Sequence, residues 1–109
     1  MTRVLFICGK NQLRSPTAEQ VFADYAHTET DSAGVSHDAD VMVSAEQIEW
    51  ADVIFVMENT HRRKLTQKYP RLLHNKRIIC LDIPDHYQDM PAELIELLKR
   101  KVTPHLSHS

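Results

Sequence analysis

Short, unbroken apolar runs separated by helix-like segments limit most strongly what this chain can fold into. Strong runs cover residues 4–7, 52–57 and 77–81, and a weaker one covers residues 29–33 before Gly34. An apolar run that does not alternate with polar residues is typical of a strand covered on both faces of a parallel sheet. We therefore predict a sheet that is buried between two layers of helices.

The segments between these runs have the spacing and the end signals of helices. Ser15 is a suitable N-cap and Pro16 suits the first helical turn, while Ser44 predicts the start of a second, shorter helix. Alternation of strands and helices predicts an α/β fold in three layers, with a four-stranded parallel sheet, in one domain spanning residues 1–109. The expected helices cover residues 16–25, 45–50, 59–69 and about 89–103.

Composition and charge exclude several classes of function. A net charge of −2 gives no general attraction to nucleic acid or to an anionic membrane, and neither is expected as a partner. The start MTRVLFIC lacks the features of a secretory signal, and two cysteines cannot form a disulfide framework, so we expect a cytoplasmic protein. The seven histidines lack metal-ligand spacing and are expected to be mostly solvated.

The stretch CGKNQLRS follows the first apolar run and contains an unusual combination of residues. A strand-to-helix turn gathers backbone N–H groups, so it can hold an oxyanion, and a thiol such as Cys8 ionises more easily there. Arg14 can hold two phosphate oxygens, Gly9 allows a close backbone approach, and Asn11 tolerates a left-handed conformation. With the Ser15 hydroxyl as a donor to the thiolate, the stretch predicts an oxyanion site beside a nucleophilic sulfur.

Residues 8–19, CGKNQLRSPTAE, resemble the signature of the low-molecular-weight protein tyrosine phosphatases, C-x-G-N-x-C-R-S-P-x-A-E. Two further segments resemble that family: residues 31–34, and residues 51–57 followed by Asn59. The resemblance implies the fold of phosphotyrosine protein phosphatase I, with Cys8 as the nucleophile, Arg14 as the phosphate clamp and Asn11 as the loop stabiliser. It implies that Ser15 donates a hydrogen bond to the thiolate.

Two residues depart from that signature. Lys10 replaces the glycine before the asparagine and puts a positive charge at the mouth of the site, and Leu13 replaces the second cysteine. Leu13 therefore removes the vicinal thiol that could trap an oxidised nucleophile as a disulfide. The expected phosphate-binding residues of the loop are Gly9, Lys10, Asn11, Gln12, Leu13 and Ser15.

The sequence leaves the general acid open between two aspartates. The family places an Asp-Pro-Tyr loop after the fourth strand, where this chain reads DIPDHYQD from residue 82. Asp85 keeps the Asp-x-Tyr spacing and is favoured, while Asp82 keeps the distance to the strand end. Tyr87 is expected to line the pocket, Asp89 to cap the last helix, and Cys80 to be an inert core cysteine.

These features predict a cysteine-dependent phosphomonoesterase that forms a cysteinyl-phosphate intermediate and needs no metal or organic cofactor. The expected substrate is a phosphorylated protein, with phosphotyrosine favoured, or a small phosphomonoester, and phosphate or sulfate should bind in the loop. One alternative is an arsenate reductase-like enzyme, which would need relay cysteines where only Cys80 is left, or else an external thiol. Another is a non-catalytic oxyanion-binding or interaction module.

Overall fold

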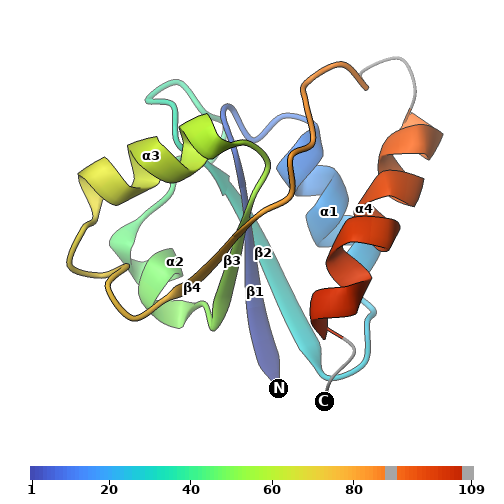
Figure 1. The fold of residues 1–109 in the computed structure, drawn as a ribbon, viewed down its shortest axis with the longest axis horizontal. Helices are drawn as coiled ribbons and strands as arrows, with labels where there is room; N and C mark the ends of the chain where they lie inside the picture. Colours follow the sequence, from blue (N-terminus) through green and yellow to red (C-terminus); the bar gives the residue numbers. More distant parts are fainter. Residues whose placement is uncertain (88–90, 107–109) are drawn as a thin grey trace.

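The computed structural model describes residues 1–87 and 91–106. Within them, four strands alternate with four helices and pair in parallel in the order β2-β1-β3-β4 (Figure 1). The predicted α/β fold with a four-stranded parallel sheet is therefore confirmed. The elements are β1 Thr2–Cys8, α1 Arg14–Phe22, β2 Thr28–Gly34, α2 Ala45–Trp50, β3 Val53–Val56, α3 Asn59–Lys68, β4 Arg77–Cys80 and α4 Pro91–Leu106.

The sheet separates two apolar cores. Helices α1 and α4 cover one face and α2 and α3 cover the other (Figure 1). Successive side chains of a strand point to opposite faces, so Phe6 of β1 packs with α1 and α4, whereas Leu5 and Ile7 pack with α2 and α3. Both faces of β1 and β3 are buried, which explains why their apolar runs are unbroken.

The predicted helix caps at Ser44 and Ser15 had different outcomes. Ser44 caps α2 as expected, because its hydroxyl accepts the N–H of Gln47 while the Gln47 side chain accepts the N–H of Ser44. The N-cap prediction for Ser15 is wrong, since α1 begins at Arg14 with Leu13 at the cap. Ser15 therefore lies inside the helix, where its side chain is buried and faces the loop.

Helix α4 extends past the end expected from its proline. The helix continues through Pro104 to Leu106, which is buried against the sheet with α1. A proline in the last turn disturbs few backbone hydrogen bonds, so burial of one more apolar side chain decides where the helix ends. The expected cap at Asp89 lies outside the described residues. No helix in residues 1–87 or 91–106 has the length and apolar character to cross a membrane.

Backbone hydrogen bonds hold the loops together at the carboxyl edge of the sheet. The N–H of Val35, after β2, donates to Cys8 O at 3.0 Å, and the N–H of Met57, after β3, donates to Ile7 O at 3.0 Å. After β4, the N–H of Ile83 donates to Met57 O at 2.8 Å. Segments that are far apart in sequence are therefore held around the end of β1.

Candidate active site

A cavity of about 240 Å³ opens at the carboxyl end of β1. It contains most of the loop residues singled out from the sequence, and it adds Ser36, which sequence reasoning missed. Asn11 and Ser15 lie beneath the loop, where both are buried. The residues that line the cavity are Cys8, Gly9, Lys10, Gln12, Leu13, Arg14, Ser36 and Asp85.

The Cys8 sulfur is buried and has two polar neighbours. Its Sγ lies 2.9 Å from Ser15 Oγ and accepts the backbone N–H of Asn11 at 3.2 Å. A thiolate at this position would therefore receive a hydrogen bond from the loop and another from α1. Both contacts suit a sulfur that carries negative charge when it attacks and again when it leaves.

A chain of hydrogen-bonded side chains beneath the loop holds Ser15 Oγ next to this sulfur. The Asn11 amide donates to Ser15 Oγ at 2.9 Å and to Ser32 Oγ at 3.0 Å, and the Ser32 hydroxyl donates to Glu19 Oε1 at 2.5 Å. Ser15 Oγ accepts from Asn11, and its own hydrogen can go to Cys8 Sγ at 2.9 Å or to Ala33 O at 3.4 Å, of which the contact with sulfur is the shorter. Asn11 has φ 56°, the left-handed conformation expected of a loop stabiliser.

Gly34 is the glycine whose lack of a side chain the packing of the loop requires. Gly9 has no positive φ, and a Cβ there would lie 3.6 Å from His61 Nε2, an ordinary contact. A Cβ on Gly34 would lie 2.7 Å from Ala39 Cβ and 3.0 Å from Asn11 N, and would also collide with Gly9 O. The end of β2 thus packs against the underside of the loop, and a larger residue at position 34 would displace it.

Arg14 is anchored on three sides before any substrate arrives. The side chain is 7% exposed, its Nη1 donates to Ile83 O at 2.8 Å, and Nη1 lies 3.4 Å from Glu58 Oε1. Its Nε lies 3.8 Å from Asp85 Oδ1. A guanidinium has five N–H donors, so donors remain for an anion in the cavity.

The two candidate acids lie in different surroundings. Asp85 lines the cavity near Arg14, whereas Asp82 does not line it. Asp82 has φ 55° and accepts the Cys80 thiol at 3.3 Å, so it serves as a turn residue at the end of β4. The geometry favours Asp85 for the proton transfer.

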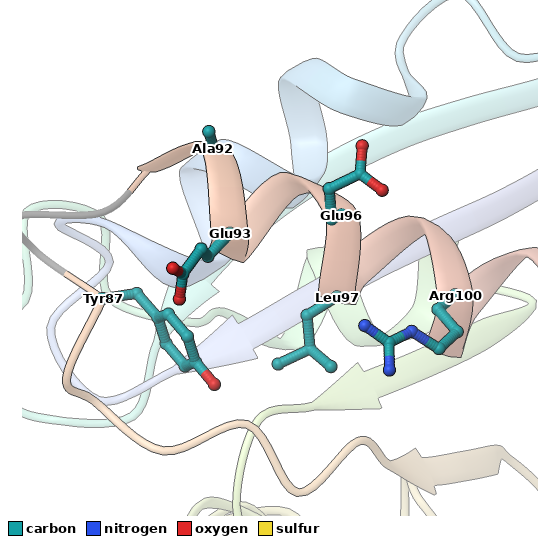
Figure 2. A pocket seen from close by; sticks show the side chains of 6 residues that line it. All are labelled: Tyr87, Ala92, Glu93, Glu96, Leu97 and Arg100. Carbon is teal, nitrogen blue, oxygen red and sulfur yellow. The ribbon is translucent and has the colours of Figure 1, made fainter.

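Tyr87 lies elsewhere than the sequence predicted. It stacks on His86, with ring centroids 4.6 Å apart, and lines a separate cavity of about 350 Å³ beside α4 (Figure 2). The Asp-x-Tyr spacing places Tyr87 in the correct loop but does not fix the direction of its side chain. The other residues of that cavity are Ala92, Glu93, Glu96, Leu97 and Arg100.

The loop that carries Asp85 is held firmly at its base. Lys101 of α4 donates from Nζ to Leu81 O at 2.7 Å and to Asp82 O at 3.3 Å. Ile83 is fully buried, and its carbonyl accepts the Arg14 guanidinium. A rigid base restricts the positions that the exposed Asp85 carboxylate can reach above the cavity.

Glu58 and His61, at the start of α3, were not identified from the sequence. His61 is buried rather than solvated, and its pKa is lowered from 6.5 to about 4 by burial and then by the charge of Arg14, so it is neutral at pH 7. Its Nδ1 accepts the N–H of Glu58 at 3.1 Å, which leaves the proton on Nε2. Both residues follow the buried strand β3, which pairs with β1, and this position could have indicated that they lie near the loop.

The remaining cysteine takes no part in the cavity. Cys80, on the edge strand β4, is half-buried rather than in the core, and burial raises the pKa of its thiol. A raised pKa favours the thiol over the more nucleophilic thiolate. In residues 1–87 and 91–106, no three His, Cys, Asp or Glu side chains are grouped so that they could hold a metal ion.

Comparisons with known proteins agree with this fold. The model of the low molecular weight phosphotyrosine protein phosphatase family matches residues 3–49, and no curated protein sequence matches the chain. Wzb from Vibrio vulnificus, solved with benzylphosphonate, is similar in structure with a TM-score of 0.82 at 20% identity, over 99% of both chains.

Two other solved structures have the same fold. The low molecular weight protein tyrosine phosphatase SP-PTP from Streptococcus pyogenes has a TM-score of 0.81 at 18% identity, over 98% of this chain and 92% of its own. The arginine phosphatase YwlE from Geobacillus stearothermophilus has a TM-score of 0.72 at 22% identity, over 100% of this chain and 98% of its own. The same fold is therefore present in proteins described as tyrosine and as arginine phosphatases.

Proposed function

We propose that this chain, which belongs to the low-molecular-weight phosphotyrosine protein phosphatase family, is a cysteine-dependent phosphomonoesterase. The observation that carries the proposal is that Cys8, Arg14 and Asp85 line one cavity. A nucleophile, an anion clamp and a proton donor are the three groups that this reaction needs.

In the first step, the Cys8 thiolate attacks phosphorus and the bond between phosphorus and the leaving oxygen breaks. Backbone N–H groups of the loop and the Arg14 guanidinium stabilise the equatorial oxygens, where negative charge is spread. Asp85 gives its proton to the leaving oxygen, which departs as the alcohol or phenol. The product on the enzyme is a cysteinyl-phosphate.

In the second step, water attacks the cysteinyl-phosphate and the sulfur–phosphorus bond breaks. The Asp85 carboxylate, which has lost its proton, accepts one from the attacking water and is restored to the acid form. Inorganic phosphate leaves, and Ser15 and the Asn11 N–H receive the returning thiolate. No metal or organic cofactor enters either step.

Phosphotyrosine is the substrate that we propose, with Leu13 as the apolar wall of the cavity that a phenyl ring would contact. The test is to measure kcat/KM of the purified protein on p-nitrophenyl phosphate and on matched phosphotyrosine and phosphoarginine peptides. Turnover of the phosphotyrosine peptide with little on phosphoarginine supports the proposal, and the reverse would reassign the substrate. No turnover of any of them would favour a binding module.

No observation favours arsenate reduction. Such chemistry needs a second thiol that can attack the first, but Cys80 is absent from the cavity and its pKa is raised. The loop position that holds a vicinal cysteine in the family is Leu13. We therefore do not carry this alternative further.

Substitution of Asp85 by Asn should slow substrates with poor leaving groups far more than activated ones, because a good leaving group departs without a proton. A loss of about 10²–10³-fold is expected for phenyl phosphate, and a smaller loss for p-nitrophenyl phosphate. The measurement is log(kcat/KM) for a series of aryl phosphates against the pKa of the leaving phenol. We expect a steeper slope in the Asp85→Asn variant than in the wild type.

Asp82→Asn is the matched control, since it makes the same change three residues earlier in the same loop. It should lower all rates evenly and by less than about tenfold, through loop geometry alone. A steeper slope in the Asp82 variant only would transfer the acid role to Asp82. Unchanged slopes in both variants would remove the role from both.

A further inference from the structure

Positive charge is concentrated in one part of the chain, although the net charge is small. Residues 59–81 contain seven of the 13 Lys and Arg residues and no Asp or Glu, so this segment has a formal charge of +7 and the rest of the chain −9. The segment comprises α3, β4 and the connection between them. Its basic residues are Arg62, Arg63, Lys64, Lys68, Arg71, Lys76 and Arg77.

The first turn of α3 borders the cavity. Glu58, just before the helix, lies 3.4 Å from Arg14, and His61 Nε2 lies 3.6 Å from where a Cβ on Gly9 would be. Figure 1 shows α3 running from the carboxyl edge of the sheet outward along its face. Arg62 and Arg63 are the next two residues of the same helix after His61.

The cations at the start of α3 are exposed and unpaired. In residues 1–87 and 91–106, no ion pair includes Arg62, Arg63 or Lys64. Arg62 and Arg63 lie in the half of the helix nearer its N-terminus, where the helix dipole does not favour positive charge. Within the described residues, no ion pair accounts for this cluster as a contribution to stability. Arg62 and Arg63, with Thr66 and Gln67, line a shallow hollow of about 320 Å³.

We propose that α3 is a docking surface for acidic residues that flank the phosphorylated residue of a protein substrate; this inference rests on the proposed function. A ten-residue helix is about 15 Å long, and an extended chain covers that length in about five residues. A peptide with its phosphorylated residue in the cavity can thus reach Arg62 and Arg63 with the residues beside it. This continuity with the cavity favours an acidic protein segment over a nucleic acid or a membrane.

The test compares two phosphotyrosine peptides of equal length, one with Glu and Asp flanking the phosphorylated residue and one with Gln and Asn. We expect the Arg62→Glu/Arg63→Glu variant to lose about tenfold or more in kcat/KM on the acidic peptide, as two favourable charge contacts become repulsive. On the amide peptide and on p-nitrophenyl phosphate, the change should stay under about twofold. In the wild type, 0.5 M NaCl should remove most of the preference for the acidic peptide.

The matched control is Lys99→Glu/Arg100→Glu, which makes the same charge change at two exposed neighbours on α4, across the sheet from α3. This variant should keep the preference for the acidic peptide. An equal loss in both double variants would overturn the docking surface in favour of a general field effect. If Arg62→Glu/Arg63→Glu lowered kcat/KM on p-nitrophenyl phosphate as much as on the acidic peptide, the docking surface would also be overturned, because the effect would then lie at the cavity itself.

Binding to the Cys8→Ser protein, followed by fluorescence anisotropy of the labelled peptides, separates this proposal from the proposed function. Tighter binding of the acidic peptide that depends on Arg62 and Arg63 supports the docking surface even if the wild type turns over no substrate. Equal binding of both peptides overturns it even if the enzyme is active. Binding of duplex RNA or anionic vesicles through the same arginines, with no effect of peptide charge, would replace the partner and overturn it as well.

Discussion

Cys8→Ser is expected to lower kcat/KM on p-nitrophenyl phosphate by on the order of 10⁴-fold or more, while leaving phosphate affinity within about threefold of the wild type. A serine hydroxyl is far less acidic than a thiol, so it presents no anion to attack phosphorus. In the proposed mechanism the loop N–H groups and Arg14 hold the oxyanion, and the substitution leaves these groups in place. Steady-state kinetics and phosphate titration by calorimetry measure the two quantities on the same protein.

Cys80→Ser is the matched control for this loss. Cys80 is the only other cysteine of the chain and does not line the cavity, so its replacement should change the rate by less than about twofold. Near-normal turnover in the Cys8 variant would remove the thiolate from the mechanism. A loss of phosphate affinity equal to the loss of rate would show instead that the loop had collapsed.

Arg14→Lys should be nearly as damaging as Arg14→Ala, with a loss of about 10³-fold in kcat/KM on p-nitrophenyl phosphate. The ammonium group of lysine is a point charge, so it cannot bind two phosphate oxygens side by side as the planar guanidinium of arginine can. It also cannot keep the contacts of Arg14 with Ile83 O, Glu58 and Asp85 together. The loop and the acid would therefore lose their alignment even though the positive charge is retained.

Arg62→Lys is the matched control, because it makes the same chemical change at an exposed arginine outside the cavity. We expect it to leave kcat/KM on p-nitrophenyl phosphate unchanged. Thermal unfolding of the variants at both positions checks that the fold is intact. If Arg14→Lys kept most of the activity of the wild type, bidentate phosphate binding would be excluded, and Arg14 would be a structural link between the loops.

Most of the oxyanion loop was predictable because its parts are neighbours in sequence. Cys8, Arg14 and Ser15 lie within eight residues, and a strand-to-helix turn brings such residues to one place whatever the rest of the chain does. The sheet was predictable for a similar reason, since unbroken apolar runs permit few arrangements. Parallel pairing also explains why the loop after β4 reaches the end of β1.

The choice between two aspartates depended on long-range packing that spacing does not contain. Burial of Ile83 and the left-handed conformation of Asp82 direct Asp82 toward Cys80 and leave Asp85 at the cavity. The direction of Tyr87 depends in the same way on its packing beside α4. Sequence spacing identifies the loop in which such residues lie but not which side chain faces the site.

The sequence did not reveal the side chains of other strands and helices that contact the loop. Glu58 reaches Arg14 only because β3 pairs with β1, and Ser32 reaches Asn11 only because β2 pairs on the other side. The basic character of α3 was hidden by averaging, because the net charge of the whole chain is −2. A count of charge along successive segments would have revealed it.

The most direct measurement is to identify the phosphorylated atom during turnover. The wild-type protein is mixed with a phosphotyrosine peptide, quenched in acid within one turnover, digested, and analysed by mass spectrometry. We predict one phosphoryl group on the peptide that contains Cys8. Rapid product release without phosphorylated Cys8, or a phosphoryl group on another residue, would contradict covalent catalysis by this cysteine.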